Sequence, residues 1–326
     1  MQKFLIMAKQ FLRSYVYHLP HTVEEALVLL REEAMVLAGG TDLLLKIPPH
    51  HSPLTIYYSP LSLVDITDIR ELKCISLRDG HIRLGALTTF SDLLRSELID
   101  QEAPLLKYGA GAFASPQLRS QATLVGNAIN ASPAGDGLTC LFALGASFIV
   151  RNEIREREVH VEELVVGPGV TSLRPGELVT AILIPRLGPG WGFHFIKHAH
   201  RSSLAIAIVS AVAGVRLSPD GSIADLRLSV GAVSPTPLRL QALEDELKGL
   251  DPNDRRISLG LDKVRGLISP IDDIRASAWY RREVTPVILR RAFEKAVEKA
   301  RVINQGLRFG VSNQGSVIRN WSSEQF

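Results

Sequence analysis

Cysteine is scarce in this sequence, and its scarcity excludes one kind of site. The 326 residues include two cysteines, Cys74 and Cys140, which are far apart and form no Cys-x-x-Cys pair. An iron–sulfur cluster needs about four thiolate ligands, so this chain cannot hold one alone. Two isolated cysteines also favour a reducing compartment.

Long apolar runs and an excess of one charge are missing as well. The formal net charge is only +3, too small to predict a nucleic-acid surface. The longest apolar stretch, Leu204 to Val215, contains Ser210 and Gly214 and falls short of the roughly 18 apolar residues of a membrane span. The apolar run near residue 1 is too short for a secretory signal. We therefore expect a cytoplasmic protein with no integral membrane segment and no nucleic-acid partner.

Several catalytic signatures are also absent. The Gly109-Ala110-Gly111 sequence lacks the third glycine of a dinucleotide-binding fingerprint. There is no P-loop, no His-Glu-x-x-His spacing and no Ser/His/Asp nucleophile signature. The sequence therefore offers no common motif for hydrolysis or metal-dependent catalysis.

The first part of the chain alternates helix and strand signals. Thr22 and Glu25 have capping-box spacing before a helix, and residues 35–38 predict a short buried strand. Residues 74–87 predict a hairpin around Asp79-Gly80. We expect a helix from Thr89 through Leu98, another helical stretch to about Phe113, and strands at 147–151 and 178–184.

After residues 185–190 the pattern changes to strands followed by helices. Strands are predicted at 192–197, 205–217 and 223–233, and helices at 237–247 and 284–301. Such an order is typical of a separate α+β domain. We expect an N-terminal subdomain at 1–60, a second at 61–188, the α+β domain at 189–302, and an extended or disordered tail at 303–326.

One candidate binding segment follows the first predicted strand. It runs Ala38, Gly39, Gly40, Thr41, Asp42, Leu43, Leu44. Adjacent glycines let the backbone turn sharply and present N–H groups to an anion. A helical turn after Thr41 would offer its positive end to a phosphate. The alternative is a plain strand–turn–helix corner, which Gly-Gly-Thr alone would favour.

A second candidate segment extends from Thr123 to Asp136 and reads as a loop of small residues. Asn127, Asn130 and Asp136 could give directional hydrogen bonds to a large polar ligand. The alternative is a solvated loop in which Asp136 caps a helix that ends at Gly145. Fourteen such residues in a row favour the ligand loop.

With these two segments in this order and spacing, the chain resembles the medium, flavin-binding subunits of the xanthine dehydrogenase and carbon monoxide dehydrogenase family. The resemblance runs from about Tyr15 to Arg301. It implies an α+β protein in which a two-subdomain, p-cresol methylhydroxylase-type FAD-binding unit precedes a C-terminal α+β domain. That last domain would have a three-stranded sheet plus helices.

The resemblance also implies roles for individual residues. Residues Ala38 to Leu44 would hold the FAD pyrophosphate, and Phe113 would lie beside the isoalloxazine. Asp136 would bind FAD, and Lys197 would face it from the C-terminal domain. The remaining implied contacts with noncovalently bound FAD are Ala122, Thr123, Gly126, Asn127, Asn130 and, more weakly, Val179.

Two positions depart from the family pattern. Val125 replaces the first glycine of the usual Gly-Gly-Asn, and Leu118-Arg119-Ser120 stands where the family often has Ile-Arg-Asn. Both put individual contacts in doubt. The chain also lacks the cysteine-bearing insertion of hydroxybenzoyl-CoA reductase flavoproteins.

The function implied is electron relay within a molybdenum hydroxylase. An iron–sulfur small subunit with 2Fe-2S clusters and a molybdopterin large subunit would complete a heterotrimer or its dimer. Two alternatives stay open: a self-sufficient flavin oxidoreductase of the same fold, and a scaffold subunit that has lost FAD. The sequence specifies neither the substrate hydroxylated by the complex nor the final electron acceptor.

Overall fold

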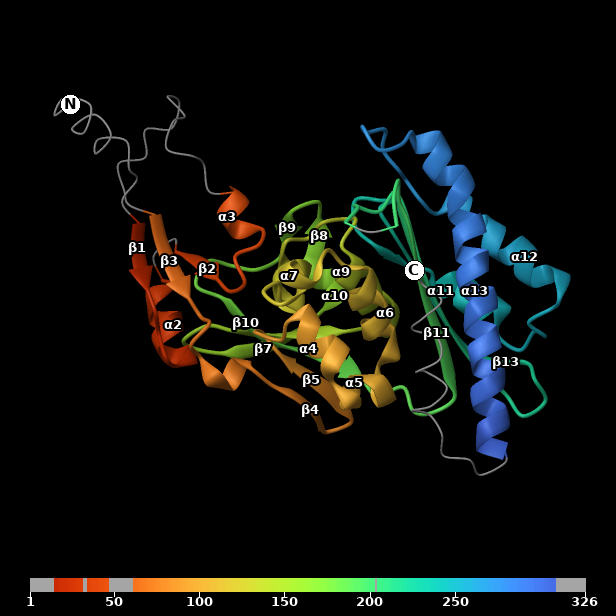
Figure 1. Cartoon of the computed structure of the whole chain (residues 1–326), viewed down its shortest axis with the longest axis horizontal. Coiled ribbons are helices and arrows are strands. Elements are labelled where there is room, and N and C mark those ends of the chain that lie inside the picture. Colours follow the sequence, from red (N-terminus) through yellow and green to blue (C-terminus); the bar gives the residue numbers. More distant parts are fainter. Residues whose placement is uncertain (1–14, 32–33, 47–60, 203, 309–326) are drawn as a thin grey trace.

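The computed structural model describes residues 15–31, 34–46, 61–202 and 204–308 (Figure 1). Its first unit is a parallel three-stranded sheet in the order β1-β3-β2, with helix α2 between β1 and β2. Helix α2 begins as predicted, because the Thr22 hydroxyl accepts a hydrogen bond from the Glu25 N–H. The elements are β1 (Tyr15–His18), α2 (Val23–Leu29), β2 (Met35–Leu37), α3 (Leu43–Lys46) and β3 (Leu61–Asp65).

The second unit is an antiparallel five-stranded sheet in the order β4-β5-β10-β6-β7. Its β4–β5 hairpin turns at Asp79 and Gly80, whose φ angles of 51° and 73° match a two-residue hairpin turn. The strands are β4 (Ile75–Arg78), β5 (His81–Gly85), β6 (Ser147–Arg151), β7 (Glu156–His160) and β10 (Leu178–Pro185).

Short helices fill the long insertion between β5 and β6 and form one core with both sheets. Two of them are separate helices where one was predicted, because Ser96 leaves the helical conformation (φ −75°, ψ 121°) and caps the next helix. The smaller elements are η1 (Arg70–Leu72), α4 (Phe90–Arg95), α5 (Glu97–Glu102), α6 (Pro104–Ala112), α7 (Pro116–Arg119), α8 (Leu124–Ile129), α9 (Asp136–Leu144), α10 (Val161–Leu164), β8 (Val165–Gly167) and β9 (Val170–Thr171).

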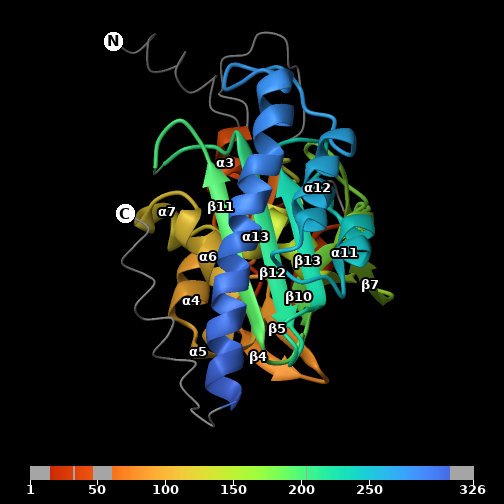
Figure 2. The same ribbon diagram turned by 90° about the vertical axis from the view of Figure 1, so that its right-hand side faces the viewer.

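The third unit is an antiparallel sheet in the order β11-β12-β13-β14, with helices on one face. Figure 2 shows α13 running along this sheet. The elements are β11 (Trp191–His198), β12 (Val209–Leu217), β13 (Ile223–Gly231), β14 (Leu238–Arg239), α11 (Gln241–Leu247), α12 (Arg255–Asp262), η2 (Lys263–Gly266) and α13 (Ala278–Arg308). None of the helices in the described ranges has the length and apolarity needed to cross a bilayer.

The third unit packs directly on the second. Alternate residues Trp191, Phe193 and Phe195 of β11 join the core of the first two units. Helix α9 lies against the same sheet, where Ser229 Oγ donates to the Thr139 carbonyl at 3.0 Å. In Figure 1 the sheet stands edge-on between α6 and α9 on one side and α13 on the other. The C-terminal domain is therefore in close contact with the helices that follow β5.

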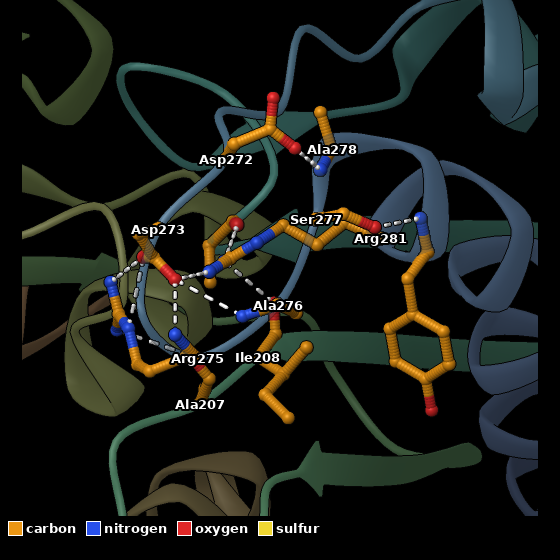
Figure 3. Close-up of polar contacts among 11 residues, drawn as sticks. Ala207, Ile208, Asp272, Asp273, Arg275, Ala276, Ser277, Ala278 and Arg281 are labelled. Carbon is orange, nitrogen blue, oxygen red and sulfur yellow. Dashed lines mark hydrogen bonds and ion pairs between the residues drawn. The ribbon is translucent and has the colours of Figure 1, made fainter.

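A buried arginine ties the loop before α13 to this sheet (Figure 3). Arg281 is 1% exposed and its Nη1 donates to the carbonyls of Ile208 and Ala232, at 3.0 and 2.8 Å. Its Nη2 donates to Asp273 Oδ1 at 2.6 Å, and Asp273 also binds the Arg275 guanidinium. This network fixes the loop on the edge of the core.

Several sequence-based boundaries are wrong. Strand β3 pairs with β1 and β2, so the first unit extends beyond residue 60. The C-terminal sheet has a fourth strand, β14, at residues that were predicted to begin a helix. Residues 303–308 belong to α13, which also includes Pro286; the rest of the predicted tail lies outside the described residues. A proline removes one N–H donor, which a 31-residue helix tolerates.

Candidate functional site

A concave pocket of about 330 Å³ lies between the first unit and the helices that follow β5. Its size falls within the range of small-molecule sites. It brings together all the residues that the sequence suggested except Leu44, Asp136 and Lys197. The predicted residues that line it are Ala38, Gly39, Gly40, Thr41, Asp42, Leu43, Phe113, Ala122, Thr123, Gly126, Asn127, Asn130 and Val179.

The Gly39-Gly40 segment forms one wall. A Cβ atom on Gly39 would stand 2.0 Å from the Gln121 carbonyl oxygen, so only glycine lets the two loops touch. Gly40 has φ +68°, a conformation that favours glycine. These two glycines therefore bring the segment after β2 against the loop before α8.

The same segment presents a row of hydrogen-bond donors. The backbone N–H groups of residues 39–42 donate to no described residue, and they lie in or beside the pocket. Consecutive free N–H groups in a turn suit an anion such as a phosphate. Helix α3 is a single turn, so these N–H groups, and not a helix dipole, are what the segment offers.

The opposite wall is partly helical, which corrects the first half of the loop predicted from Thr123 to Asp136: residues 124–129 form α8, and residues 130–135 lie in no helix or strand. Thr123 caps α8, its hydroxyl accepting a hydrogen bond from the Gly126 N–H at 3.0 Å. Gly126 and Asn127 therefore lie in the first turn of a helix. The carboxamide oxygen of Asn127 is buried and has no hydrogen-bond partner among the described residues.

Phe113 closes the pocket where α6 ends. Its ring stacks on Phe90, with ring centroids 4.0 Å apart and an angle of 13° between the planes. Ala114, the next residue, has φ 43°, which is strained for a residue with a side chain. The turn after α6 thus sets the position of this aromatic ring.

Asp136 and Lys197 do not line the pocket. Asp136 is the first residue of α9, whose cap is Gly135, so the predicted capping role is wrong. Its carboxylate binds Lys197 Nζ at 2.6 Å, and the same ammonium donates to the Ala112 carbonyl at 3.1 Å. Burial raises the pKa of Asp136 to about 6, although the charge of Lys197 acts in the opposite direction. The other carboxylate oxygen, Oδ1, is buried without a partner among the described residues.

Leu44 is the third suggested residue that does not line the pocket. It lies in α3, half exposed, and packs near Gly40. Leu44 therefore packs on the Gly39-Gly40 turn from outside the pocket.

Some lining residues carry no motif that could have predicted them. Met35 and Val36 line the pocket, and the predicted buried strand is therefore only half-buried. Lys46 donates to the Asn130 carboxamide oxygen across the opening. Glu177 forms a two-bond ion pair with Arg157, whose hydrogen bonds hold the pKa of this carboxyl below its usual range. The other additional lining residues are Ile66, Ala86, Val125, Ile129, Leu173 and Leu178.

Two family models match the chain. Residues 10–187 match the FAD binding domain in molybdopterin dehydrogenase, and residues 194–296 match the CO dehydrogenase flavoprotein C-terminal domain. The first match contains the whole pocket, and the second contains Lys197 and most of the sheet that bears it.

Individual proteins agree with these matches. The chain is 30% identical over 283 residues to the glyceraldehyde dehydrogenase medium chain of Sulfolobus acidocaldarius, covering 86% of this chain and 98% of the relative. It is 30% identical over 295 residues to the carbon monoxide dehydrogenase medium chain of Afipia carboxidovorans, covering 88% and 98%. Its structure is similar to reconstituted CO dehydrogenase from Oligotropha carboxidovorans, with a TM-score of 0.81, 29% identity, and coverage of 88% and 98%. The chain therefore belongs to the family of FAD binding domains of molybdopterin dehydrogenases, which are oxidoreductases.

Proposed function

We propose that this chain is the FAD-binding electron-transfer subunit of a molybdenum-containing hydroxylase or dehydrogenase. In that role it relays electrons from 2Fe-2S clusters to an external acceptor. The observation that carries the proposal is the row of N–H groups at residues 39–42, which have no acceptor among the described residues and line one pocket together with α8.

The pocket fits FAD in its chemistry. FAD joins a doubly charged pyrophosphate to a flat aromatic ring system, so it needs anion-binding groups and apolar walls in one site. The N–H groups of residues 39–42 and Lys46 supply the anion-binding groups, and Val36, Ile66 and Phe113 supply the apolar walls. Residues 38–43, with Thr123 and Asn130, would hold the phosphates and the polar chain.

When bound, FAD supplies one-electron and two-electron redox chemistry. The protein's own residues bind it, orient it and keep water away. Phe113 and the α8 wall bound the pocket on one side, and the contact between Gly39 and Gln121 closes it behind. Lys197 donates to the Ala112 carbonyl and to Asp136, so this cation and this carboxyl lie beside the residue that precedes Phe113.

The relay proposal requires partner chains. Two cysteines cannot bind a 2Fe-2S cluster that takes four ligands, so the clusters must lie on another chain. Relatives are named as medium chains of dehydrogenases, which supports an iron–sulfur small subunit and a molybdopterin large subunit as the partners. We propose a heterotrimer or its dimer.

A pull-down separates this proposal from a self-sufficient flavoprotein. The full chain, tagged and expressed at its native level in its source cells, should co-purify with equimolar iron–sulfur and molybdopterin subunits. Iron and molybdenum analysis of the eluate identifies both cofactors. A flavin-containing chain that elutes without either metal would contradict the relay and favour the self-sufficient enzyme. A chain that elutes with both partners and without flavin would favour the scaffold.

A further inference from the structure

The C-terminus of α6 is held by two cations from different parts of the fold. A helix leaves its last four carbonyl groups without partners inside the helix. Here Arg119 Nη1 donates to the carbonyls of Gly111, Phe113 and Ala110, at 2.7, 3.2 and 3.4 Å. Lys197 Nζ donates to the Ala112 carbonyl at 3.1 Å. Two side chains thus donate to the carbonyl groups at the end of α6 and at its cap, Phe113; of these, the Ala110 carbonyl also accepts the Phe113 N–H at 3.3 Å.

The Arg119 guanidinium binds only the end of α6 among the described residues. Its hydrogen bonds within that part of the chain all go to these three carbonyls. It lies at the end of α7, which is capped by Ser115 and begins three residues after Phe113. The chain therefore folds back after Phe113, which brings the Arg119 side chain into contact with the turn after α6.

The bond to the Phe113 carbonyl has a specific consequence. That oxygen belongs to the peptide between Phe113 and Ala114, and Ala114 has φ 43°. A residue with a side chain in this left-handed region costs about 1 kcal/mol or more, and the fold must hold it there. By fixing the peptide before Ala114, Arg119 holds the strained turn that directs the Phe113 ring onto Phe90 and into the pocket wall.

We infer that Arg119 is a positioning residue for the cofactor: it acts through Phe113, by holding the turn after α6 in the conformation that completes the FAD pocket. This inference rests on the proposed function, because it concerns the binding of FAD. The competing explanation is that Arg119 only stabilises the end of a helix, as basic residues often do.

A double-mutant cycle distinguishes the two explanations. The affinity of the full-length apoprotein for FAD is measured by quenching of FAD fluorescence in the wild type, Arg119→Met, Phe113→Leu and the double variant. Visible circular dichroism of the bound flavin is recorded in parallel. If Arg119 acts through Phe113, each single variant raises the Kd about tenfold and the double variant raises it no further, since contacting residues couple by roughly this amount.

Two further variants give the rescue and the control. Arg119→Lys keeps a cation that can donate to the same carbonyls, and we expect it to recover most of the affinity. Ala114→Gly removes the strain of the turn, so in the Arg119→Met background it should also recover affinity. Arg186→Met removes a two-bond ion pair with Glu102, two residues before α6. It should lower the melting temperature and leave the Kd and the flavin dichroism unchanged.

The outcomes are distinct. The positioning role would be overturned if the losses of FAD affinity added up in the double variant. It would also be overturned if Arg119→Met lowered the melting temperature and left the Kd unchanged. Either result would mean that Arg119 only caps the helix. If Arg119→Met yields no folded protein, Arg119→Gln, which removes the charge and shortens the side chain, takes its place in the cycle under the same criteria. A wild-type chain that binds no FAD would contradict the proposed function itself, which separates that failure from failure of this inference.

Discussion

Asp136 at the start of α9 and Lys197 on β11 form a buried ion pair, with 2.6 Å between Oδ2 and Nζ. The pair joins the FAD-binding unit to the C-terminal sheet, and both side chains are largely buried, with 4% and 13% exposed. Taking such a pair out of water is costly, so it is not by itself a source of stability. Through the bond from Lys197 to the Ala112 carbonyl, the pair also contacts the end of α6, next to the pocket residue Phe113.

The Asp136→Asn variant should become more stable relative to the wild type as pH rises. The pKa of Asp136 is about 6 in the folded protein and about 3.9 in an unfolded chain. Between these values the unfolded wild type loses its proton first, so wild-type stability falls with rising pH, whereas asparagine does not titrate. From about pH 4 to pH 7 the variant should gain on the order of 2–3 kcal/mol relative to the wild type.

Urea unfolding of the two apoproteins at several pH values measures this difference. Lys197→Met removes the charge that lowers the Asp136 pKa, so with Asp136 intact the fall in stability should continue to higher pH. A relative stability that stays constant or falls with pH would show that Asp136 is ionised throughout. Because Asp136 does not cap α9, we also expect Asp136→Asn to lose more FAD affinity than stability at neutral pH.

Gly39→Ala should damage both stability and flavin binding. Its Cβ would meet the Gln121 carbonyl at 2.0 Å, so the two walls of the pocket must separate. We expect a loss of about 3 kcal/mol, the upper part of the usual range for overpacking, together with loss of FAD. Gly266→Ala is the matched control, since a Cβ there meets nothing within 4 Å. A stable, flavin-containing Gly39→Ala protein would refute the close contact between the loops.

Gly126→Leu should give a folded protein without FAD. Gly126 lines the pocket, and a Cβ there meets only the Thr123 hydroxyl, at 2.8 Å. Disturbing that cap costs about 1 kcal/mol, which is too little to unfold the chain. Far-ultraviolet circular dichroism near that of the wild type, with no bound flavin, is the expected result. Full flavin occupancy would mean that this turn of α8 does not face the cofactor.

Asp273→Asn should destabilise the C-terminal domain most at neutral pH. Burial raises the pKa of Asp273, but hydrogen bonds from Arg275 and Ala276 and the charge of Arg281 outweigh it and hold the pKa far below its usual range. The carboxylate therefore contributes stability above the unfolded pKa, and this contribution is lost as the pH falls toward the folded value. We expect the variant to lose about 3 kcal/mol at neutral pH, because Arg281 would stay buried without its partner.

Thermal unfolding at neutral and acidic pH measures this loss. The difference between variant and wild type should shrink below about pH 4, where the wild-type carboxylate begins to lose its advantage. A difference that is equally large at both pH values would argue against the ion pair with Arg281.

Local signals in the sequence predicted much of this fold. The Thr22 cap, the Asp79-Gly80 hairpin and the Gly145 end of α9 are confirmed, because each depends on residues adjacent in sequence. The first half of the loop predicted from Thr123 to Asp136 was wrong for a local reason as well, because residues 124–129 form a helix. Small and polar residues such as Gly126 and Asn127 disfavour helix, and here the packing of α8 against α9 and β10 overrides that preference.

The parts of the site that could not be predicted depend on distant contacts. Gly39 touches Gln121, and Arg119 reaches back to the end of α6; neither relation has a sequence signature. Lys197 was expected to face the cofactor, whereas here it binds Asp136 and the Ala112 carbonyl. Direct contact of each suggested residue with FAD stays a prediction.

The most direct test of the account is the visible absorption spectrum of the purified full-length chain. We predict a flavin spectrum with FAD equimolar to the chain, and release of all the colour into the filtrate when the protein is denatured and passed through a membrane. Colour retained on the polypeptide would contradict noncovalent binding. A folded chain that stays colourless after incubation with excess FAD would contradict the central claim.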